Sequence, residues 1–173
     1  MQIEGTVALV TGANRGLGKA IVAALLAAGA EKVYAAARDE RTISLHDPRV
    51  VPVTLDVTSA ADAEAAVRAA VDRFGRIDVL VNNAASFFAG YFEELTPEQV
   101  HQQLAASLVG PMNVTRAVLP VMRKQRSGHI ISISSSAGIA AGFEFVSAYA
   151  ASKFGLEGWM ESLQAEVAPF GIT

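Results

Sequence analysis

The stretch TVALVTGANRGLG, residues 6–18, decides the fold of this chain. Its first half is a β-branched apolar run, which is typical of a buried strand. Gly12 ends that run, and a helical pattern continues from about Arg15 to Ala28, where Gly29 stops it. A strand that passes through a glycine-rich turn directly into a helix is the opening of a βαβ unit. These residues therefore predict an α/β protein.

Three glycines at this one junction favour a phosphate site. Gly12 permits the tight exit from the strand, Gly16 lets the backbone approach a phosphate, and Gly18 lets the helix pack closely on the sheet. The helix N-terminus then offers free N–H groups and the positive end of its dipole to a pyrophosphate. We predict a dinucleotide site here. The alternative is a glycine-rich turn without a ligand.

Apolar runs and helical patterns alternate along the whole chain. The predicted strands cover residues 6–11, 32–37, 50–55, 77–82 and 129–134, and the predicted helices cover about 15–28, 59–74 with Ser59 as N-cap, 96–126 with Thr96 as N-cap, and 148–168. Pro52 is expected near the start of its strand, and the polar segment 38–49 is expected to be a loop or a single turn. This order predicts a doubly wound parallel sheet, a Rossmann-like three-layer αβα arrangement in one domain over residues 1–173. Ligands of such sheets bind at the carboxyl ends of the strands.

The composition narrows the class of protein. Of 173 residues, 51% are hydrophobic and 18% are charged, which indicates a folded domain with a net charge of −3. The densest basic run, residues 123–126, is expected at a helix C-terminus, so no nucleic-acid partner is predicted. Cysteine is absent, and His46, His101 and His129 lack ligand spacing, so no metal is predicted. The start lacks signal-peptide features, and the longest apolar run, about residues 20–30, is short for a membrane span. A cytoplasmic protein without a membrane partner is expected.

The end of the second predicted strand indicates which dinucleotide binds. An NAD site places an acidic residue there to hold the ribose 2′-hydroxyl, whereas this chain has Ala37 followed by Arg38. Arg15 stands inside the glycine loop, and two guanidinium groups suit a 2′-phosphate. The prediction is NADP(H) over NAD(H). Asp39 is the counter-evidence, because NAD would be favoured if this carboxylate took the ribose position.

The pentapeptide YAASK carries the predicted proton-transfer chemistry. Tyr149 and Lys153 lie four residues apart on a predicted helix, so both side chains share one face. A nearby positive charge stabilises a phenolate, which lets a phenol exchange a proton with an alcohol or a carbonyl oxygen. Without its context, such a pair is more often two surface neighbours.

With these residues in place, the chain resembles the short-chain dehydrogenase/reductase family over essentially its whole length. TGANRGLG (11–18) looks like the family's TGxxxGxG cofactor loop, LDVT (55–58) like its adenine-contacting segment, NNAA (82–85) like its NNAG motif, SSSAG (134–138) like its catalytic serine segment, and YAASK (149–153) like its tyrosine–lysine motif. Five motifs in the family's order make the resemblance specific.

The resemblance implies a set of functional residues. Ser135 would bind the substrate oxygen, Tyr149 would be the general acid/base, and Lys153 would assist Tyr149 and hold the nicotinamide ribose. Ser132, Ser134 and Ser136 stay as alternatives to Ser135. The implied NADP(H) contacts are Gly12, Asn14, Arg15, Gly16, Leu17, Gly18, Arg38, Asp56 (the adenine amino group), Val57, Asn82 (the central strand and the adenosine ribose side), Ala84, Tyr149 and Lys153.

The implied function is hydride transfer between NADP(H) and a carbonyl or secondary-alcohol substrate. The alternative is a nucleotide-binding protein of the same fold with little or no catalysis. Aromatic residues after the fourth and fifth predicted strands either line an apolar substrate pocket or pack on the core; they are Phe87, Phe88, Phe143 and Phe145. In the family the long helix and the tyrosine helix form the dimer surfaces. This implies a homodimer or homotetramer, and Leu104, Leu108 and Met112 form a stripe that could also face only the sheet.

Three departures from the family's pattern bear on activity. Ser107 stands where the family has an Asn that holds a water of a proton relay, and a hydroxyl could hold that water with fewer hydrogen bonds. Ala85 replaces the Gly of NNAG, so its methyl could weaken cofactor binding or shift the loop. The chain stops at Gly171–Thr173, before the family's further strand, nicotinamide loop and substrate lid. We therefore expect an incomplete C-terminus and an unpaired outer edge on the fifth strand.

Overall fold

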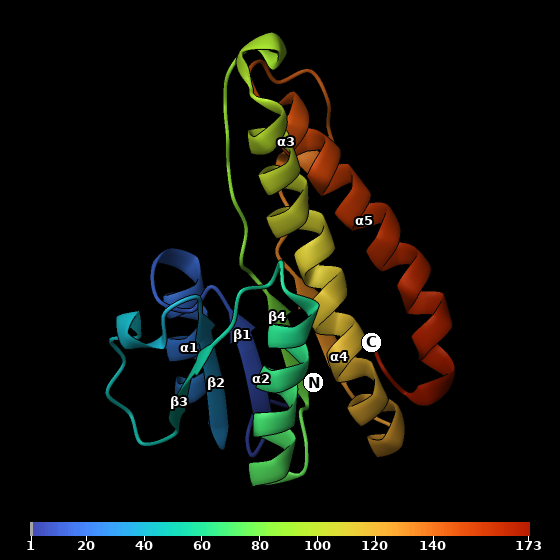
Figure 1. Cartoon of the computed structure of the whole chain (residues 1–173). Coiled ribbons are helices and arrows are strands. Elements are labelled where there is room, and N and C mark those ends of the chain that lie inside the picture. Colours follow the sequence, from blue (N-terminus) through green and yellow to red (C-terminus); the bar gives the residue numbers. More distant parts are fainter. Residues whose placement is uncertain (1) are drawn as a thin grey trace.

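The computed structural model describes residues 2–173. The chain folds around one five-stranded parallel sheet (Figure 1). The strand order is β3-β2-β1-β4-β5, and every neighbouring pair is parallel. The strands are β1 (Val7–Thr11), β2 (Lys32–Ala37), β3 (Val50–Thr54), β4 (Val79–Asn82) and β5 (His129–Ser132). The order reverses between β1 and β4, and this is where doubly wound sheets bind their ligands. The predicted fold class is confirmed.

Helices cover both faces of the sheet. They are α1 (Gly16–Ala27), α2 (Ala60–Phe74), α3 (Pro97–Leu104), α4 (Gly110–Gln125) and α5 (Ser147–Val167), with short 3₁₀ turns at Glu40–Thr42, Phe92–Glu94, Ser136–Gly138 and Ala168–Phe170. One apolar cluster joins the sheet to α1, and another joins its opposite face to α2, α4 and α5. The two predicted N-caps are confirmed, because the Ser59 and Thr96 hydroxyls accept bonds from the third residue of their helices.

The long predicted helix runs without a break from Pro97 to Gln125, but its middle is a π-turn at Ala105–Val109. Single π-turns occur often at functional sites. By length and composition alone this helix could span a bilayer, with a mean hydropathy of 1.2 in its most apolar window. Val114, Val118 and Met122 of its C-terminal half are fully buried against the sheet and α2, as in the core helix of a folded domain.

Segment 38–49 contains only one helical turn, Glu40–Thr42, as the sequence indicates. Pro52 lies in the middle of β3, so the expectation of a place near the strand start is wrong. β3 is an edge strand, and a missing N–H is tolerated where no neighbour needs it.

The last residues of the chain pair with the start of β5. Ile172 bridges Gly128, the Ile130 N–H donates to the Thr173 carbonyl at 2.8 Å, and the Thr173 N–H donates to the Gly128 carbonyl at 3.0 Å. The expectation of an unpaired edge is therefore wrong for this part of β5. Further along the strand, the Ile131 side chain stays 41% exposed.

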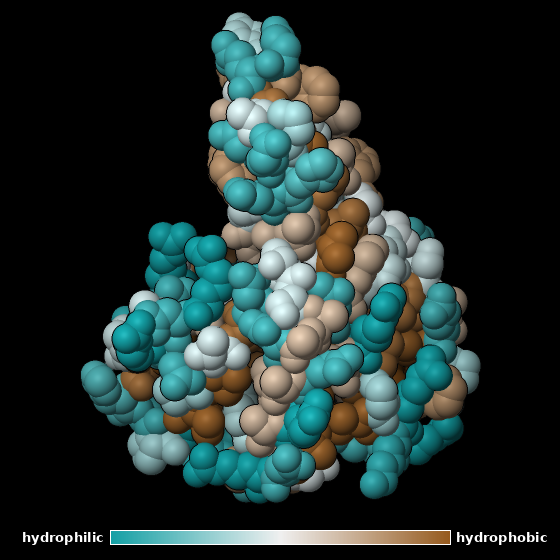
Figure 2. Space-filling view, in the orientation of Figure 1, coloured by the Kyte–Doolittle hydropathy of each residue, from teal (hydrophilic) through white to brown (hydrophobic). Residues whose placement is uncertain are grey.

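The helical segment that begins with α3 and the helix α5 rise together beyond the carboxyl edge of the sheet (Figure 1). On this narrow upper part, polar residues cover the side of α3, and apolar residues show on the side of α5 (Figure 2). The loops after β4 and β5 run to the same end (Figure 1). The residues implied for chemistry follow these two strands along the chain, so this raised pair of helical segments stands beside the predicted site.

Candidate functional site

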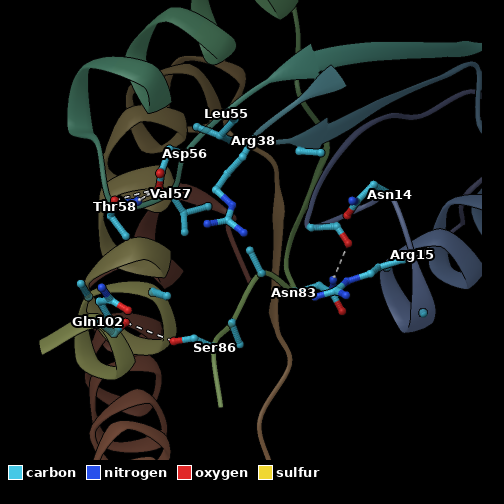
Figure 3. Close-up of a pocket in the computed structure, with 18 of the residues that line it drawn as sticks. Asn14, Arg15, Arg38, Leu55, Asp56, Val57, Thr58, Asn83, Ser86 and Gln102 are labelled. Atoms are coloured by element: carbon cyan, nitrogen blue, oxygen red, sulfur yellow. Dashed lines mark hydrogen bonds between the residues drawn. The ribbon is translucent and has the colours of Figure 1, made fainter. Parts of the chain in front are cut away.

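A cavity of about 1090 Å³ opens at the carboxyl ends of the central strands (Figure 3). Its walls come from the glycine loop, the ends of β2 and β3, the loop after β4 and one face of the long helix. Ten of the predicted cofactor residues line it: Gly12, Asn14, Arg15, Gly16, Leu17, Gly18, Arg38, Asp56, Val57 and Ala84. The volume and the place in the fold suit a dinucleotide.

The glycine loop has the geometry that its sequence predicts. Gly12 and Gly16 have φ values of +64° and +52°, which side chains rarely adopt. A Cβ on Gly18 would lie 2.2 Å from the Gly12 carbonyl oxygen, so only glycine lets α1 approach the loop. Arg15 precedes α1 without a side-chain capping bond, which leaves first-turn N–H groups of the helix available to an anion at the cavity.

Asn83 holds the cavity's inner wall, and the sequence reading missed it. Its Nδ2 donates to the carbonyls of Thr11 and Gly12 at 2.9 and 3.2 Å, so it fastens the loop after β4 to the glycine loop (Figure 3). The Thr11 hydroxyl accepts bonds from the N–H groups of Asn83 and Ala84. The signal was present in the sequence as the second Asn of NNAA and the Thr before Gly12.

Asn82 is not among the residues that line the cavity, and its implied place beside the adenosine ribose stays a prediction. Its side chain is 3% exposed, and its Nδ2 donates to the Thr115 hydroxyl at 3.1 Å and the Ser132 hydroxyl at 3.3 Å. These bonds tie β4 to α4 and β5, which matches the implied support of the central strand. Side chains alternate along a strand, so neighbouring Asn residues serve different faces.

Arg38 and Arg15 place two guanidinium groups at the cavity. Arg38 reaches in beside Val57, and Arg15 lies near Asn83 (Figure 3). Among residues 2–173 neither Arg forms an ion pair. Asp39 also borders the cavity, but its two carboxylate oxygens accept bonds from the Arg41 guanidinium at 2.8 and 2.9 Å. The hydrogen bonds from Arg41 hold the pKa of the Asp39 carboxyl below its usual value.

Asp56 and Val57 form the wall opposite the glycine loop. Asp56 Oδ1 accepts bonds from the N–H and the hydroxyl of Thr58, which fixes the turn after β3. Val57 packs on Gly110 of α4, where an added Cβ would come within 2.7 Å of Val57 Cγ2. The long helix therefore fixes the position of this wall.

Ser135, Tyr149 and Lys153 lie outside the cavity lining, around the end of β5 and the start of α5. Lys153 is 3% exposed, and its Nζ donates to the Ile133 carbonyl at 2.6 Å and lies 5.8 Å from the centre of the Tyr149 ring. Burial lowers the pKa of the Lys153 ammonium, and the Glu157 charge partly opposes this. The predicted tyrosine–lysine face is thus present.

The four serines after Ile131 have separate surroundings. Ser132 donates to Met160 Sδ and accepts from Asn82, and the Ser134 hydroxyl is buried without a partner within residues 2–173. Ser135 accepts a bond from the Ala137 N–H at 3.2 Å, and Ser136 begins a 3₁₀ turn. That turn packs on α5, because a Cβ on Gly138 would lie 3.1 Å from the Lys153 carbonyl oxygen.

The loops after β4 and β5 meet around Tyr149. The Phe87 ring packs edge-on against the Tyr149 ring with centroids 4.9 Å apart, and Tyr91 packs in the same way on Phe145. The Gly90 N–H donates to the Phe145 carbonyl at 3.0 Å. Phe87, Phe143 and Phe145 remain 58%, 52% and 44% exposed, so these rings form an apolar surface beside the phenol.

Comparison with known proteins agrees with this geometry. A family model described as short chain dehydrogenase matches residues 6–173. This chain belongs to the short-chain dehydrogenase family. It is 40% identical over 170 residues to a 3-ketodihydrosphingosine reductase of Bacteroides thetaiotaomicron, and the aligned stretch covers 98% of this chain and 61% of that protein. It is 35% identical over 176 residues to a 3-oxoacyl-[acyl-carrier-protein] reductase of Vibrio cholerae, which covers all of this chain and 72% of that protein.

Solved short-chain dehydrogenases share the fold closely. One from Burkholderia cenocepacia, determined in complex with NADP, has a TM-score of 0.90 and 35% identity over 99% of this chain and 70% of its own. This short-chain dehydrogenase chain spans only 55 to 61% of the length of three of its relatives.

The structure shows the surroundings of Ala85 and Ser107, the two internal departures from the family pattern. Ala85 lines the cavity, is exposed, and is not among the non-glycine residues with positive φ in the described part of the chain, so its backbone does not require glycine. Ser107 is fully buried in the π-turn. Its hydroxyl donates to the Ser86 carbonyl and accepts from Gln103 Nε2 and the Ser86 N–H. A hydroxyl has one donor and two acceptor positions, and these three bonds occupy all of them.

Proposed function

We propose that this chain binds NADP(H) and catalyses hydride transfer between NADP(H) and a carbonyl or secondary-alcohol substrate. The observation that carries this proposal is the placement of a glycine-loop cavity at the sheet's switch point, with a buried lysine and a tyrosine at the neighbouring strand end. The 3-ketodihydrosphingosine and 3-oxoacyl reductases among its relatives support a reductase of ketone groups.

The cavity fits the cofactor on grounds of its own structure. The uncapped start of α1 suits a pyrophosphate, and the positive-φ glycines keep side chains away from it. When bound there, the nicotinamide supplies or accepts the hydride. Asp56 and Val57 would border the adenine, and Lys153 would hold ribose hydroxyls with the donors that Ile133 leaves free.

The proton chemistry falls to this chain's own residues. Tyr149 would give a proton to the substrate oxygen in reduction and take it back in oxidation. Lys153 would stabilise the phenolate by its charge, which acts over a short distance at a buried position. Ser135 would hydrogen-bond the substrate oxygen and hold it toward Tyr149. Ser134 is less suited to this role, because its hydroxyl is buried.

Two free guanidinium groups support NADP(H) over NAD(H). Arg15 and Arg38 are unpaired within residues 2–173, whereas Asp39 is occupied by Arg41. A guanidinium binds a phosphate through two parallel hydrogen bonds, and a carboxylate already paired is a poor acceptor for a ribose hydroxyl. Tighter binding of NADH than of NADPH, measured as Kd by fluorescence titration, would contradict this choice.

An apolar substrate is supported by the rings beside Tyr149. Phe87, Phe143 and Phe145 are all more than 40% exposed, and Phe87 touches the phenol ring. A homodimer or homotetramer through the long helix and α5 is also part of the proposal. Val109 and Phe154 on these helices are 44% and 43% exposed, and sedimentation equilibrium measures the assembly.

The test is oxidation of NADPH with a panel of short and long-chain ketones. It compares the wild type with Tyr149→Phe. We expect turnover that rises with the apolar length of the ketone and falls by about 10²-fold or more in the variant. Equal rates for both proteins would refute Tyr149 as the general acid/base.

One observation favours a second function, that of a nucleotide-binding protein with little or no catalysis. The cavity is lined by the predicted cofactor residues, but Ser135, Tyr149 and Lys153 lie outside its walls. NADPH binding without turnover of any ketone would favour this function.

A further inference from the structure

We propose that Gln103 and Ser107 form a latch that positions the loop Ser86–Phe88 beside Tyr149. In this proposal Ser107 is a positioning residue and not part of a proton relay. The effect on catalysis rests on the proposed function, whereas the effect on the loop does not.

The latch satisfies the polar backbone of the loop after β4. Gln103 Nε2 donates to the Ser86 carbonyl at 2.7 Å and to Ser107 Oγ at 2.8 Å, and Gln103 Oε1 accepts from the Phe88 N–H at 3.0 Å. Ser107 Oγ donates to the same Ser86 carbonyl at 3.1 Å and accepts from the Ser86 N–H at 3.3 Å. Two side chains of one helix therefore bond three backbone groups of the loop, the Ser86 N–H, the Ser86 carbonyl and the Phe88 N–H.

Both latch residues are fully buried, which makes these bonds matter. Gln103 and Ser107 are each 0% exposed, and they lie one helical turn apart on the same face. A buried amide or carbonyl that loses its partner pays the full cost of its lost hydration. Removal of either side chain would therefore leave part-buried backbone groups of the loop, and the buried side chain that remains, without partners, and the loop would move to reach water.

The loop connects the latch to the site. Ser86 and Phe88 line the cavity, and Phe87 between them packs on the Tyr149 ring. A further hydrogen bond, from the Ser86 hydroxyl to the Gln102 carbonyl at 3.1 Å, holds the same end of the loop to α3 (Figure 3). A shift of this loop changes both the cavity wall and the contact on the phenol.

The decisive variants are Ser107→Ala and Gln103→Met, with exposed α5 positions as matched controls, Ser162→Ala and Gln164→Met. Hydrogen exchange, followed by NMR, reports on the amides of Ser86 and Phe88 without any need for turnover. We expect faster exchange at both amides in the latch variants and no change in the controls. Unchanged exchange in both latch variants would overturn the latch.

Steady-state kinetics test the positioning role in the same proteins. We expect kcat to fall by about 10-fold or more in each latch variant, because small displacements at a reacting centre are costly, while the shape of the pH profile stays. The double variant should lose less than the product of the two single losses, since the two side chains share bonds. Faster exchange with an unaltered kcat would overturn the positioning role.

Ser107→Asn separates the latch from a relay. The larger amide at this fully buried position would displace the Gln103 amide, so the latch predicts a lower kcat. A relay role predicts a higher kcat and a shifted pH profile, and that result would overturn the proposal. Expected exchange rates in a wild type that turns over no ketone would instead contradict the proposed function alone.

Discussion

Lys153 shows at the scale of one residue how function costs stability. Its ammonium is 3% exposed and has one carbonyl partner, Ile133, within the described chain. Burial disfavours the charged form, and this is why the pKa of Lys153 lies below its ordinary value. The same positive charge beside the Tyr149 ring is what the proposed proton transfer requires.

The lowered pKa gives a prediction with a definite sign. Below its folded-state pKa, Lys153 is protonated in both states, and the folded chain carries the full burial cost. As the pH rises through that pKa toward the unfolded value of 10.5, the folded chain releases its proton first and gains stability. The free energy of unfolding of the wild type should therefore rise with pH relative to that of Lys153→Met, by at most about 1.4 kcal/mol per pH unit. Urea unfolding curves at several pH values measure this difference. Parallel stability curves would contradict the burial argument.

Gly18 gives a second prediction at the residue scale. A Cβ there would stand 2.2 Å from the Gly12 carbonyl oxygen and 2.5 Å from Asn83 Nδ2. We expect Gly18→Ala to lower the free energy of unfolding by about 2 kcal/mol or more, because backbone atoms must move. Gly158→Ala is the control, since it lies in α5 with no atom near the added Cβ, and it should stabilise by up to about 1 kcal/mol. Equal effects of the two changes in thermal unfolding would refute the close-approach argument.

Single residues also show where prediction from sequence stopped. The glycine spacing was sufficient for the loop, because each glycine answers a local requirement of backbone shape. Asn82 and Asn83 could not be separated, since only the register of β4 decides which amide reaches the glycine loop. The role of Asp39 depended on Arg41 folding back onto it, and a short-range pattern does not reveal which side chain a carboxylate selects.

At the scale of elements, strands and helices followed from apolar periodicity and caps. The five predicted strands and the four main helices are present, with ends that differ by a few residues. The π-turn at Ala105–Val109 was not predicted, because a segment of five residues is too short for its wider period to show in a sequence. The latch was missed because nothing in the sequence indicates that Gln103 is buried.

The connection between β2 and β3 yields a prediction about acid. Asp47 bonds the Arg49 guanidinium at 2.8 Å, and Arg49 Nη1 also donates to the Leu26 carbonyl at the end of α1. The bond from Arg49 lowers the pKa of Asp47 to about 2 from 3.8. A depressed carboxyl pKa stabilises the fold above the unfolded value, and this contribution is lost as the pH falls through about 2.

We therefore expect Asp47→Asn to be less stable than wild type at neutral pH and to differ progressively less from it between about pH 4 and pH 2. The effect is small, because the pair is partly exposed to solvent. Asp72→Asn is the matched control, an exposed carboxyl that forms no ion pair within residues 2–173. A constant difference at all pH values, measured by urea unfolding, would rule out the ion pair as its source.

At the scale of the whole molecule, the cavity joins the two apolar clusters. The glycine loop continues into α1, which packs on one face of the sheet, and Val57 belongs to the cluster with α2 and α4 on the other face. Asn83 ties the loop after β4 to the end of β1 between them. A ligand that fills the cavity therefore contacts groups held by both clusters, and it should oppose global unfolding and not only local opening.

This coupling makes cofactor preference measurable without turnover. NADPH at about a hundred times its Kd should raise the free energy of unfolding by about 2.7 kcal/mol, because it binds only the folded state. At the same concentration, an NADH affinity tenfold weaker should give about 1.4 kcal/mol less. The double variant Arg15→Ala and Arg38→Ala should remove this difference and retain the smaller effect, since the pyrophosphate site at α1 stays intact. Equal stabilisation of wild type by the two cofactors in urea unfolding would contradict the assignment of the two guanidinium groups to a 2′-phosphate.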